Sequence, residues 1–322
     1  MDISCAFPAN SAAVEQAVLA EQLGYERVWI YDSPALYHDV WVTLARIAER
    51  TERIGLGPGV LVPHLRHPMT QAAAIATLDE LAPRRLAVAF GAGFTGRLAM
   101  GRPMLSRREF ERGVRQVMAL LRGEVVEVDG AATQMLHSDG FAPARPIDVP
   151  VLVNAQGPRG QTFAREIESG VTVSFRPVPG FDWCAVLSTG TVLDPGESPR
   201  SQRAFEATAP SLAVRYHGTA ARGQSLEAFP GGEDWASSIA GVAEDVRHLE
   251  IHRGHLVELN EHDRKALAAE SESPAQLTGT VGEIRERLEA LEAGGATELM
   301  WQPMGPDIER EMRTFAELLG QA

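Results

Sequence analysis

Two glycine-rich turns, each placed directly after a short apolar run, constrain the fold of this chain most. The first run is residues 54–62, with glycine at 55, 57 and 59, and the second is residues 86–90, followed by Gly91-Ala92-Gly93. Runs of this length are typical of strands buried in a parallel sheet. Residues 72–82, with apolar side chains at helical spacing, lie between them. This order predicts that both turns lie at the carboxyl edge of one sheet, where α/β proteins bind ligands.

The same alternation of strand and helix patterns covers most of the chain. We expect strands at residues 3–7, 28–31, 54–62, 86–90, 150–153, 170–175, 184–192 and 298–303. Only about eight residues join the strands expected at 170–175 and 184–192, fewer than a parallel crossover normally needs. We expect helical pieces over 195–277 and a small hairpin over 124–139. The pattern predicts one α/β domain over residues 1–322, a (β/α)8 TIM barrel with insertions, and a doubly wound sheet is the second choice.

The acidic composition limits the partners of this chain. A formal net charge of −13 argues against binding to nucleic acid or to an anionic membrane, because both need a basic surface. Cys5 and Cys184 give no disulfide framework, and no run of about 18 apolar residues is present. The N-terminal DISCAF segment enters a strand-like run without a basic leader. We therefore expect a cytoplasmic protein with a small-molecule substrate, no nucleic-acid partner and no membrane span.

A third glycine-bearing turn is a candidate phosphate site. It consists of Asn154-Ala155-Gln156-Gly157-Pro158-Arg159-Gly160, which follow a predicted strand and open a predicted helix. Backbone amides without partners converge at such a helix start, where the helix dipole is positive. The turn can therefore bind a phosphate. The alternative is an ordinary strand-to-helix turn whose glycines only make the bend.

Three polar residues near the first turn are candidates for chemistry. Asp32 ends a predicted strand, and His64 and His67 lie just beyond another. A carboxylate or an imidazole at the carboxyl edge can exchange a proton with a bound molecule. Each can instead cap a loop or a helix, and for His67 we favour the cap. Asp32 and His64 remain candidate catalytic residues.

Histidines also occur close together late in the chain. His248, His252 and His255 are spaced by four and three residues, which places them on one face of a helix. No cysteine accompanies them and the nearby carboxylates are scattered, so we expect no metal site. We favour His255 for the substrate side of the pocket, as a third candidate catalytic residue, together with His217. A surface or half-buried position is the alternative for each of them.

Three segments, GPGVLVPHLRHP, ATLDEL and AFGAG, resemble in this order segments of the luciferase-like oxidoreductases, the superfamily of bacterial luciferase. Within it, the resemblance is to the branch that includes methylenetetrahydromethanopterin reductase and uses coenzyme F420. This resemblance implies that a cofactor phosphate binds at Ala155 to Gly160. It also implies that Gly59-Val60 is a non-proline cis peptide behind the cofactor ring, for which a β-bulge is the alternative. Gly91, Ala92 and Gly93 are expected to complete the bare backbone that faces the cofactor.

The resemblance implies an oxidoreductase that transfers a hydride between F420 and a small organic substrate, acting as a homodimer. An FMN-dependent monooxygenase and a flavin-binding barrel without turnover are the alternatives. The sugar-phosphate dehydrogenases of the family carry a histidine where this chain has Ser33, which places alcohol oxidation by that route in doubt. Four arginines just beyond residues 86–90 are expected to bind the anionic tail of F420. They are Arg97, Arg102, Arg107 and Arg108.

Overall fold

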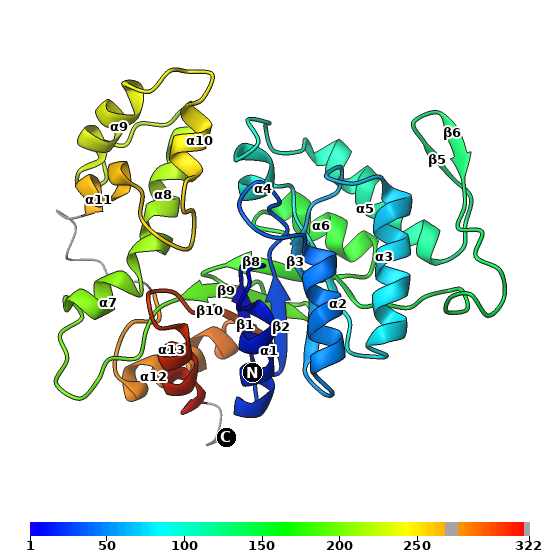
Figure 1. The fold of residues 1–322 in the computed structure, drawn as a ribbon, viewed down its shortest axis with the longest axis horizontal. Coiled ribbons are helices and arrows are strands. Elements are labelled where there is room, and N and C mark those ends of the chain that lie inside the picture. Colours follow the sequence, from blue (N-terminus) through cyan, green and yellow to red (C-terminus); the bar gives the residue numbers. More distant parts are fainter. Residues whose placement is uncertain (268–275, 319–322) are drawn as a thin grey trace.

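The computed structural model describes residues 1–267 and 276–318 and contains a closed barrel of parallel strands (Figure 1). Around the barrel the strands follow the order β1-β10-β9-β8-β7-β4-β3-β2. Their bounds are β1 (Asp2–Phe7), β2 (Arg27–Ile30), β3 (Gly55–Leu61), β4 (Val88–Phe90), β7 (Val151–Asn154), β8 (Gly170–Ser174), β9 (Cys184–Thr189) and β10 (Glu298–Gln302). Every expected strand is present, with ends that differ by at most three residues. The predicted (β/α)8 barrel is therefore confirmed.

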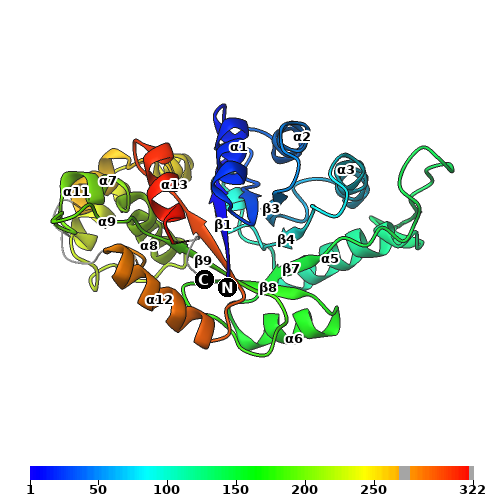
Figure 2. The same cartoon turned by 90° about the horizontal axis from the view of Figure 1, so that it is seen from below.

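Helices and one hairpin surround the strands. The helices are α1 (Ala13–Leu23), α2 (Val40–Arg50), α3 (Pro68–Leu81), α4 (Phe94–Leu98), α5 (Arg107–Leu121), α6 (Pro158–Glu166), α12 (Val281–Ala293) and α13 (Ile308–Ala316). All of them except the short α4 form a ring outside the strands when the barrel is seen from below (Figure 2). The expected hairpin consists of β5 (Val126–Val128) and β6 (Ala131–Thr133) and projects from the barrel (Figure 1).

Between β9 and α12 the chain forms a separate group of helices beside the barrel, residues 202–267, which we call the helical insertion (Figure 1). Its helices are α7 (Gln202–Glu206), α8 (Ala209–Ala221), α9 (Gly232–Ala240), α10 (Arg247–His252) and α11 (Glu261–Leu267). The insertion has its own apolar cluster around Tyr216 and Trp235. Since α10 contacts α4, the insertion reaches the carboxyl edge of the barrel. The part of the expected helical region at 268–275 lies outside the described residues.

The connection from β8 to β9 is a loop, residues 175–183, and not a helix. The two strands pair in parallel, from Val171 opposite Cys184 to Ser174 opposite Leu187. An extended chain of this length spans about 30 Å, whereas the strand along which it must return rises only about 17 Å. The crossover therefore needs no helix. Val178 and Phe181 of the loop pack against the barrel core in its place.

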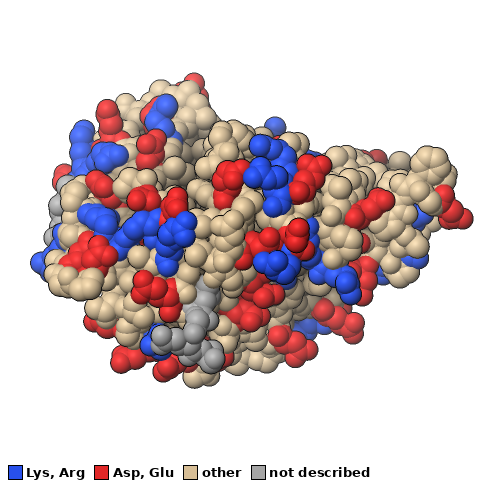
Figure 3. Space-filling model, turned by 60° about the horizontal axis from the view of Figure 1, so that its bottom comes forward, with Lys and Arg blue, Asp and Glu red and all other residues tan. Residues whose placement is uncertain are grey.

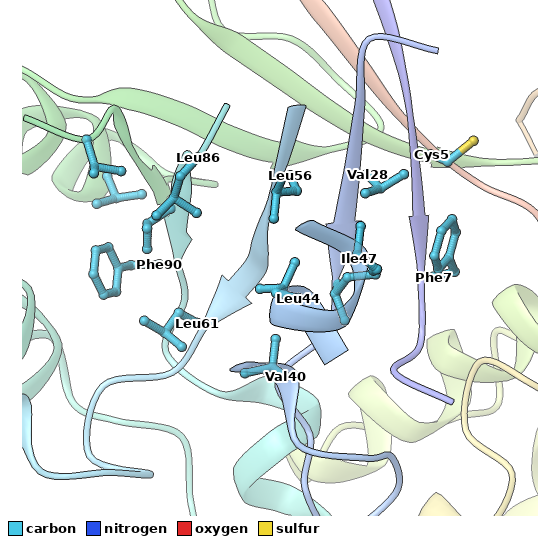
Figure 4. Packing of buried hydrophobic residues seen from close by; sticks show 14 of the residues in the cluster. Cys5, Phe7, Val28, Val40, Leu44, Ile47, Leu56, Leu61, Leu86 and Phe90 are labelled. Atoms are coloured by element: carbon cyan, nitrogen blue, oxygen red, sulfur yellow. The ribbon is translucent and has the colours of Figure 1, made fainter. Parts of the chain in front are cut away.

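Apolar side chains fill both sides of the barrel wall. Outside the strands, Val40, Leu44 and Ile47 of α2 pack in one cluster with Val28 and Leu56 (Figure 4). The inside of the barrel is filled by a smaller cluster, which includes Ala6, Trp29, Ala87, Ala89, Leu152, Ala185 and Met300. The amphipathic helices thus cover one face of the sheet, while small residues around one large indole fill the other.

Two of the glycines of β3 leave space for the neighbouring strands. A Cβ added at Gly57 would lie 1.8 Å from the carbonyl oxygen of Ala87, and one added at Gly59 would lie 2.8 Å from the Cβ of Trp29. The indole of Trp29 is held in this position because its Nε1 donates to Glu298 Oε1 at 2.7 Å. Part of the bare backbone that we expected to face a ligand therefore faces Trp29 instead.

Acidic and basic side chains are interspersed on the face shown in Figure 3. Within residues 1–267 and 276–318, no helix combines the length and the apolar character that a membrane span requires.

Candidate functional site

A cavity of about 150 Å³, which we call the rim cavity, lies at the carboxyl ends of the barrel strands. Its walls include Asp32 just after β2 and Asn154 at the end of β7. Phe94 and Thr95 of α4 and Leu256 of the helical insertion complete the lining. Segments far apart in the sequence thus meet at the edge where the glycine turns predicted a ligand site.

Backbone shapes one wall of the rim cavity. Gly59 and Val60 line it, and the peptide bond between them is cis, as the resemblance implies. Gly91 lies directly behind, because a Cβ added there would be 2.4 Å from Val60 Cγ2. Gly93 precedes α4 with a φ of 85°, a left-handed conformation that favours glycine. Ala92, between them, packs against the barrel core. A wall with so few side chains suits the flat face of a ring.

Asp32 is buried at the rim cavity and pairs with an arginine. Arg66 Nη1 lies 2.8 Å from Asp32 Oδ1, and Arg66 Nη2 lies 2.7 Å from Asp39 Oδ2. The amide of Val62 also donates to Asp32, at 3.3 Å. Burial raises the pKa of the Asp32 carboxyl, and Arg66 opposes this rise. Asp32 therefore ties the loop after β2 to the loop after β3.

His64 and His67 lie outside the rim cavity. His67 precedes α3, and its Nδ1 accepts a hydrogen bond of 3.1 Å from the amide of Met69, which confirms the favoured cap. His64 is exposed and lines a different hollow, of about 1450 Å³, together with residues of α5 and β5. His64 therefore lies away from the cavity where we expected it to exchange a proton with a bound molecule.

The first half of the predicted phosphate turn is occupied by contacts with β8. The amide of Ala155 donates to the carbonyl of Thr172 at 3.1 Å, so it is not available to a ligand. The side chain of Gln156 accepts from the amide of Ser174 and donates to the hydroxyl of the same residue. Asn154 lines the rim cavity itself.

The second half of the turn is open. Gly157 is the N-cap of α6, Pro158 lies in its first turn, and Arg159 is exposed. A Cβ added at Gly157 would meet nothing within 4 Å, whereas one at Gly160 would lie 3.1 Å from the Cα of Ala155. The open space therefore lies at the positive end of the α6 dipole. The amide of Ala155 is therefore occupied, and a phosphate site at the remaining residues of the turn stays a prediction.

Tyr31 is a site residue that the sequence analysis missed. It lines the rim cavity, and its buried hydroxyl has no hydrogen-bond partner among the described residues. Burial raises the pKa of the Tyr31 phenol well above its usual range, so the hydroxyl keeps its proton. Tyr37, in the same cavity, donates its hydroxyl to the carbonyl of His255. Only the position of Tyr31 at the end of a strand, next to Asp32, could have drawn attention to it.

Three buried histidines of the helical insertion, which we call the histidine cluster, meet behind Thr95. The Nδ1 of His255 lies 2.9 Å from the Nδ1 of His217 and 3.4 Å from the Nδ1 of His252. Thr95 Oγ1 lies 3.1 Å from His255 Nε2. His217 and His255 are neighbours, but neither is among the described residues that line the rim cavity, where we expected them. His255 contacts the lining of that cavity through the hydroxyls of Thr95 and Tyr37 and through the ring of Phe94.

His248 is not part of this cluster, although the spacing of the sequence places it beside His252. Its ring lies against Gly101, and it lines a hollow of about 710 Å³ on the side of the insertion. His217 and His252 line the same hollow. The histidine cluster therefore stands between this hollow and Thr95, which belongs to the rim cavity.

The closed barrel and the cavity at its carboxyl edge indicate a protein of the (β/α)8 class that binds a ligand there. Comparison with known families identifies the family within this class. The sequence profile described as "Luciferase-like monooxygenase" matches residues 7–187, more than half of the chain. The chain therefore belongs to the luciferase-like family, as its segments indicated.

Individual relatives agree with this assignment. The 5,10-methylenetetrahydromethanopterin reductase of Archaeoglobus fulgidus is 26% identical in an alignment of 317 residues, and this alignment covers 93% of this chain and 92% of that protein. The F420-dependent glucose-6-phosphate dehydrogenase of Beutenbergia cavernae is 35% identical over 171 residues, 48% of this chain and 49% of that protein. Other reductases also match over about half of their length. These relatives support the expected class of enzyme, an oxidoreductase.

Among solved structures, the coenzyme F420 dependent tetrahydromethanopterin reductase of Methanopyrus kandleri has the same fold. Its TM-score is 0.66 at 20% identity, and the superposition covers 98% of this chain and 97% of that one.

Proposed function

We propose that this protein transfers a hydride between coenzyme F420 and a small organic substrate. The observation that carries the proposal is the rim cavity, which is lined by Gly59, Val60 and Tyr31, whose buried hydroxyl has no hydrogen-bond partner among the described residues. Three names support it. The relative matched along nearly its whole length is named a 5,10-methylenetetrahydromethanopterin reductase, and the dehydrogenase and the solved reductase are named as F420-dependent.

The residues present fit a flat cofactor. Val60, Leu187 and Met300 make the cavity largely apolar, and Gly157 leaves space beside the start of α6. The cavity, about 150 Å³, is smaller than the roughly 300–1,000 Å³ that whole ligands occupy. It therefore suits the reacting ends of cofactor and substrate, with the rest of the cofactor along the rim toward Gly157. When bound, F420 supplies two-electron hydride chemistry, and orientation and hydrogen bonding come from the protein.

Two hydroxyls are placed to assist the reaction. An atom that accepts electron density during reduction is stabilised by a donor that is already oriented toward it. We assign this role to Tyr31 and to Thr95, which both line the cavity. His255 then acts as a positioning residue for Thr95, and Asp32 as one for the loops that Arg66 joins. We assign His64 no role at the rim, since it lines the other hollow.

Parallel titrations of the purified protein with F420 and FMN, followed by visible difference spectra, test the proposal. We expect saturation with F420 at the lower concentration. Tight binding of FMN without measurable binding of F420 would contradict it and favour an FMN-dependent monooxygenase, the activity in the description of the family profile. A spectral change with both cofactors but no turnover with any reducible substrate would favour a binding protein.

Tyr31→Phe and Tyr37→Phe form a matched pair for the substrate step. Both residues line the cavity, but only Tyr31 has a free hydroxyl among the described residues. We expect Tyr31→Phe to lower kcat by about 10- to 100-fold, which corresponds to one lost hydrogen bond of about 1.5–3 kcal/mol to a charged group. An equal loss in both variants would argue against a role for the Tyr31 hydroxyl.

The anionic tail of F420 gives a further test of cofactor choice. Arg107 and Arg108 are exposed at the start of α5, and Arg107 is paired only with Glu111 of the same helix, at 3.0 Å. Two charge-assisted hydrogen bonds from such residues contribute roughly 1.5–3 kcal/mol each. Changing both to Ala should weaken F420 binding more for longer tails and leave a tailless deazaflavin little affected.

Two finer expectations stay predictions. We propose that the protein acts in the cytoplasm, and that it forms a homodimer through α2 and α3, where Val42 is 63% exposed. Light scattering that gives the mass of a monomer at micromolar concentration would contradict the dimer.

A further inference from the structure

The histidine cluster has a chemical arrangement that the hydride reaction does not explain. Its members come from different parts of the helical insertion, with His217 on α8, His252 at the end of α10 and His255 three residues later. They are 1%, 3% and 2% exposed. Imidazoles are seldom buried to this degree without partners for both ring nitrogens. The question is therefore what their inward nitrogens bind.

The three inward nitrogens are all Nδ1 atoms, and a point between them lies close to each. Ligand atoms of the three residues lie within 4.8 Å of one another. The Nδ1 separations from His255 are 2.9 Å to His217 and 3.4 Å to His252. Zinc binds imidazole nitrogen at about 2.0–2.1 Å in tetrahedral geometry, which places neighbouring ligand nitrogens about 3.4 Å apart. The separation from His255 to His252 already matches this value, and the one to His217 needs to grow by about 0.5 Å to hold an ion.

The outward nitrogens have the partners that metal ligands usually have. His217 Nε2 lies 3.0 Å from Asp263 Oδ1, and Asp263 is itself fixed by Trp235 Nε1 at 2.9 Å. A carboxylate that accepts from one ring nitrogen leaves a lone pair on the other, which is the form that binds a metal. His255 Nε2 meets Thr95 Oγ1 in the same way. The cluster thus has an inner set of nitrogens and an outer set of oriented acceptors.

The cluster also has access to solvent on one side. The 710 Å³ hollow lined by His217 and His252 gives access from the surface and room for water as a fourth ligand.

We propose that His217, His252 and His255 bind one Zn²⁺ ion through Nδ1, with water from the hollow in the fourth position. Imidazole nitrogen is a ligand that zinc shares with other first-row ions, so cobalt can replace it as a probe. The ion would join α8 to α10 and to the segment that follows it. With Nδ1 bound to the ion, His255 would carry its proton on Nε2. The Nε2–H group would then donate a hydrogen bond to Thr95 Oγ1. The hydroxyl proton of Thr95 is then free to point into the rim cavity.

Metal content measured on the full chain tests this proposal without any cofactor. The protein is treated with a chelator, exposed to Zn²⁺, freed of excess by gel filtration and analysed by mass spectrometry for metal. We expect one zinc per chain, and absorption bands typical of tetrahedral cobalt when Co²⁺ replaces zinc. A folded wild-type protein that retains less than about a tenth of an equivalent overturns the proposal. The competing arrangement, a hydrogen bond from His255 Nδ1 to His217 Nδ1, predicts this result.

Matched variants locate the ion. We expect His217→Ala and His255→Ala to lose the equivalent, and His248→Ala, which lines the same hollow outside the cluster, to keep it. Equal loss in all three would also overturn the assignment. If the alanine variants do not fold, His252→Gln is the substitute, because the Nδ1 of His252 lies farther from the Nδ1 of His255 than that of His217 does. The cobalt absorption bands of this variant should be shifted from those of the wild type. Titration of the metal-free protein with F420 then shows whether the proposed hydride function stands when zinc binding fails.

Discussion

The barrel and the helical insertion bury different kinds of side chain at the edge where they meet. The barrel side of the rim cavity combines bare backbone and apolar groups, such as Gly59, Val60 and Met300, with polar side chains such as Asp32 and Asn154. The insertion side carries the histidine cluster and Asp263, all buried. The family profile covers residues 7–187 and ends before the insertion. The profile match therefore lies within the barrel, whereas the reductase of Archaeoglobus fulgidus aligns along nearly the whole chain, insertion included.

The largest effect should come from the barrel wall at Gly57. Gly57→Ala places a Cβ 1.8 Å from the backbone oxygen of Ala87, which cannot move without breaking the β3–β4 contact. Overpacking typically costs about 1–3 kcal/mol, and a collision with backbone lies beyond that range. We expect no folded Gly57→Ala protein to accumulate.

Gly157→Ala is the matched control on the same edge, because a Cβ there meets nothing within 4 Å. Urea denaturation should show a change in unfolding free energy of less than about 0.5 kcal/mol. Equal stability of the two variants would show that the barrel tolerates side chains where the structure leaves none.

Asp32→Ala should have the next largest effect. It leaves Arg66 without its buried partner, and breaking such a pair costs about 3–5 kcal/mol. Because Arg66 keeps its ion pair with Asp39, we expect the free energy of unfolding to fall by about 3 kcal/mol, the low end of this range.

Asp39→Ala removes a carboxylate from the same arginine, but Asp39 is 44% exposed. Asp39 also accepts from the amides of Trp41 and Val42 as the N-cap of α2, and loss of such a cap costs about 1 kcal/mol. Denaturation curves of both variants measure the difference. A larger loss for Asp39→Ala would mean that burial at the rim does not govern this ion pair.

Asp263→Ala tests the insertion. It removes the acceptor of Trp235 Nε1 and of His217 Nε2, and each buried donor left unsatisfied costs about 1–3 kcal/mol. Amide hydrogen exchange should quicken in α8 to α11 and stay unchanged in β1 to β4. Glu227→Ala, at an exposed position of the same insertion, should leave amide exchange unchanged in the insertion and in the barrel strands. Faster exchange throughout the barrel would show that the two regions unfold as one unit.

The smallest effect concerns acid stability at the base of the insertion. Partial burial raises the pKa of Glu197, but hydrogen bonds from Arg203, Ser201 and the amide of Asp194 outweigh it and lower this pKa from 4.5 to about 2. The folded state therefore binds the proton less strongly than the unfolded chain does. The stabilisation is complete above pH 4.5 and is lost as the pH falls toward about 2.

Thermal unfolding at several pH values between about 2 and 6 measures this contribution. In Glu197→Gln, the melting temperature should fall less steeply in the acid range than in the wild type. Parallel curves for the two proteins would show that Glu197 does not contribute to the acid dependence.

Much of the barrel could be predicted because its signals are local. Short apolar runs followed by glycine gave the strands, and the cap at His67 followed from its position before Pro68. The sequence did not predict that the short loop between β8 and β9 can join two parallel strands without a helix. Whether it can do so depends on the length of the strand along which it returns. Its packing through Phe181 is a tertiary contact that no spacing records.

The site was less predictable because its contacts join distant segments. Asp32 meets Arg66 across 34 residues, and His217 meets His255 across 38. The helical spacing grouped His248 with His252 and His255, but the ring of His248 lies against Gly101, outside the cluster. His217, which we favoured beside His255, completes the cluster through a contact that no spacing predicts.

The pairing of β1 with β10 has a consequence for synthesis of the chain. Both edges of the sheet remain open until Glu298 to Gln302 have left the ribosome, because β9 and β1 each lack the neighbour that β10 provides. At about 5–20 residues per second, translation lasts roughly 15–60 s from the end of β1 to β10 and roughly 5–20 s from the end of β9 to β10. During these times each of the two strand edges can pair with other nascent chains. Yield in the cell should therefore depend on chaperones that cover these edges more than on the stability of the finished barrel.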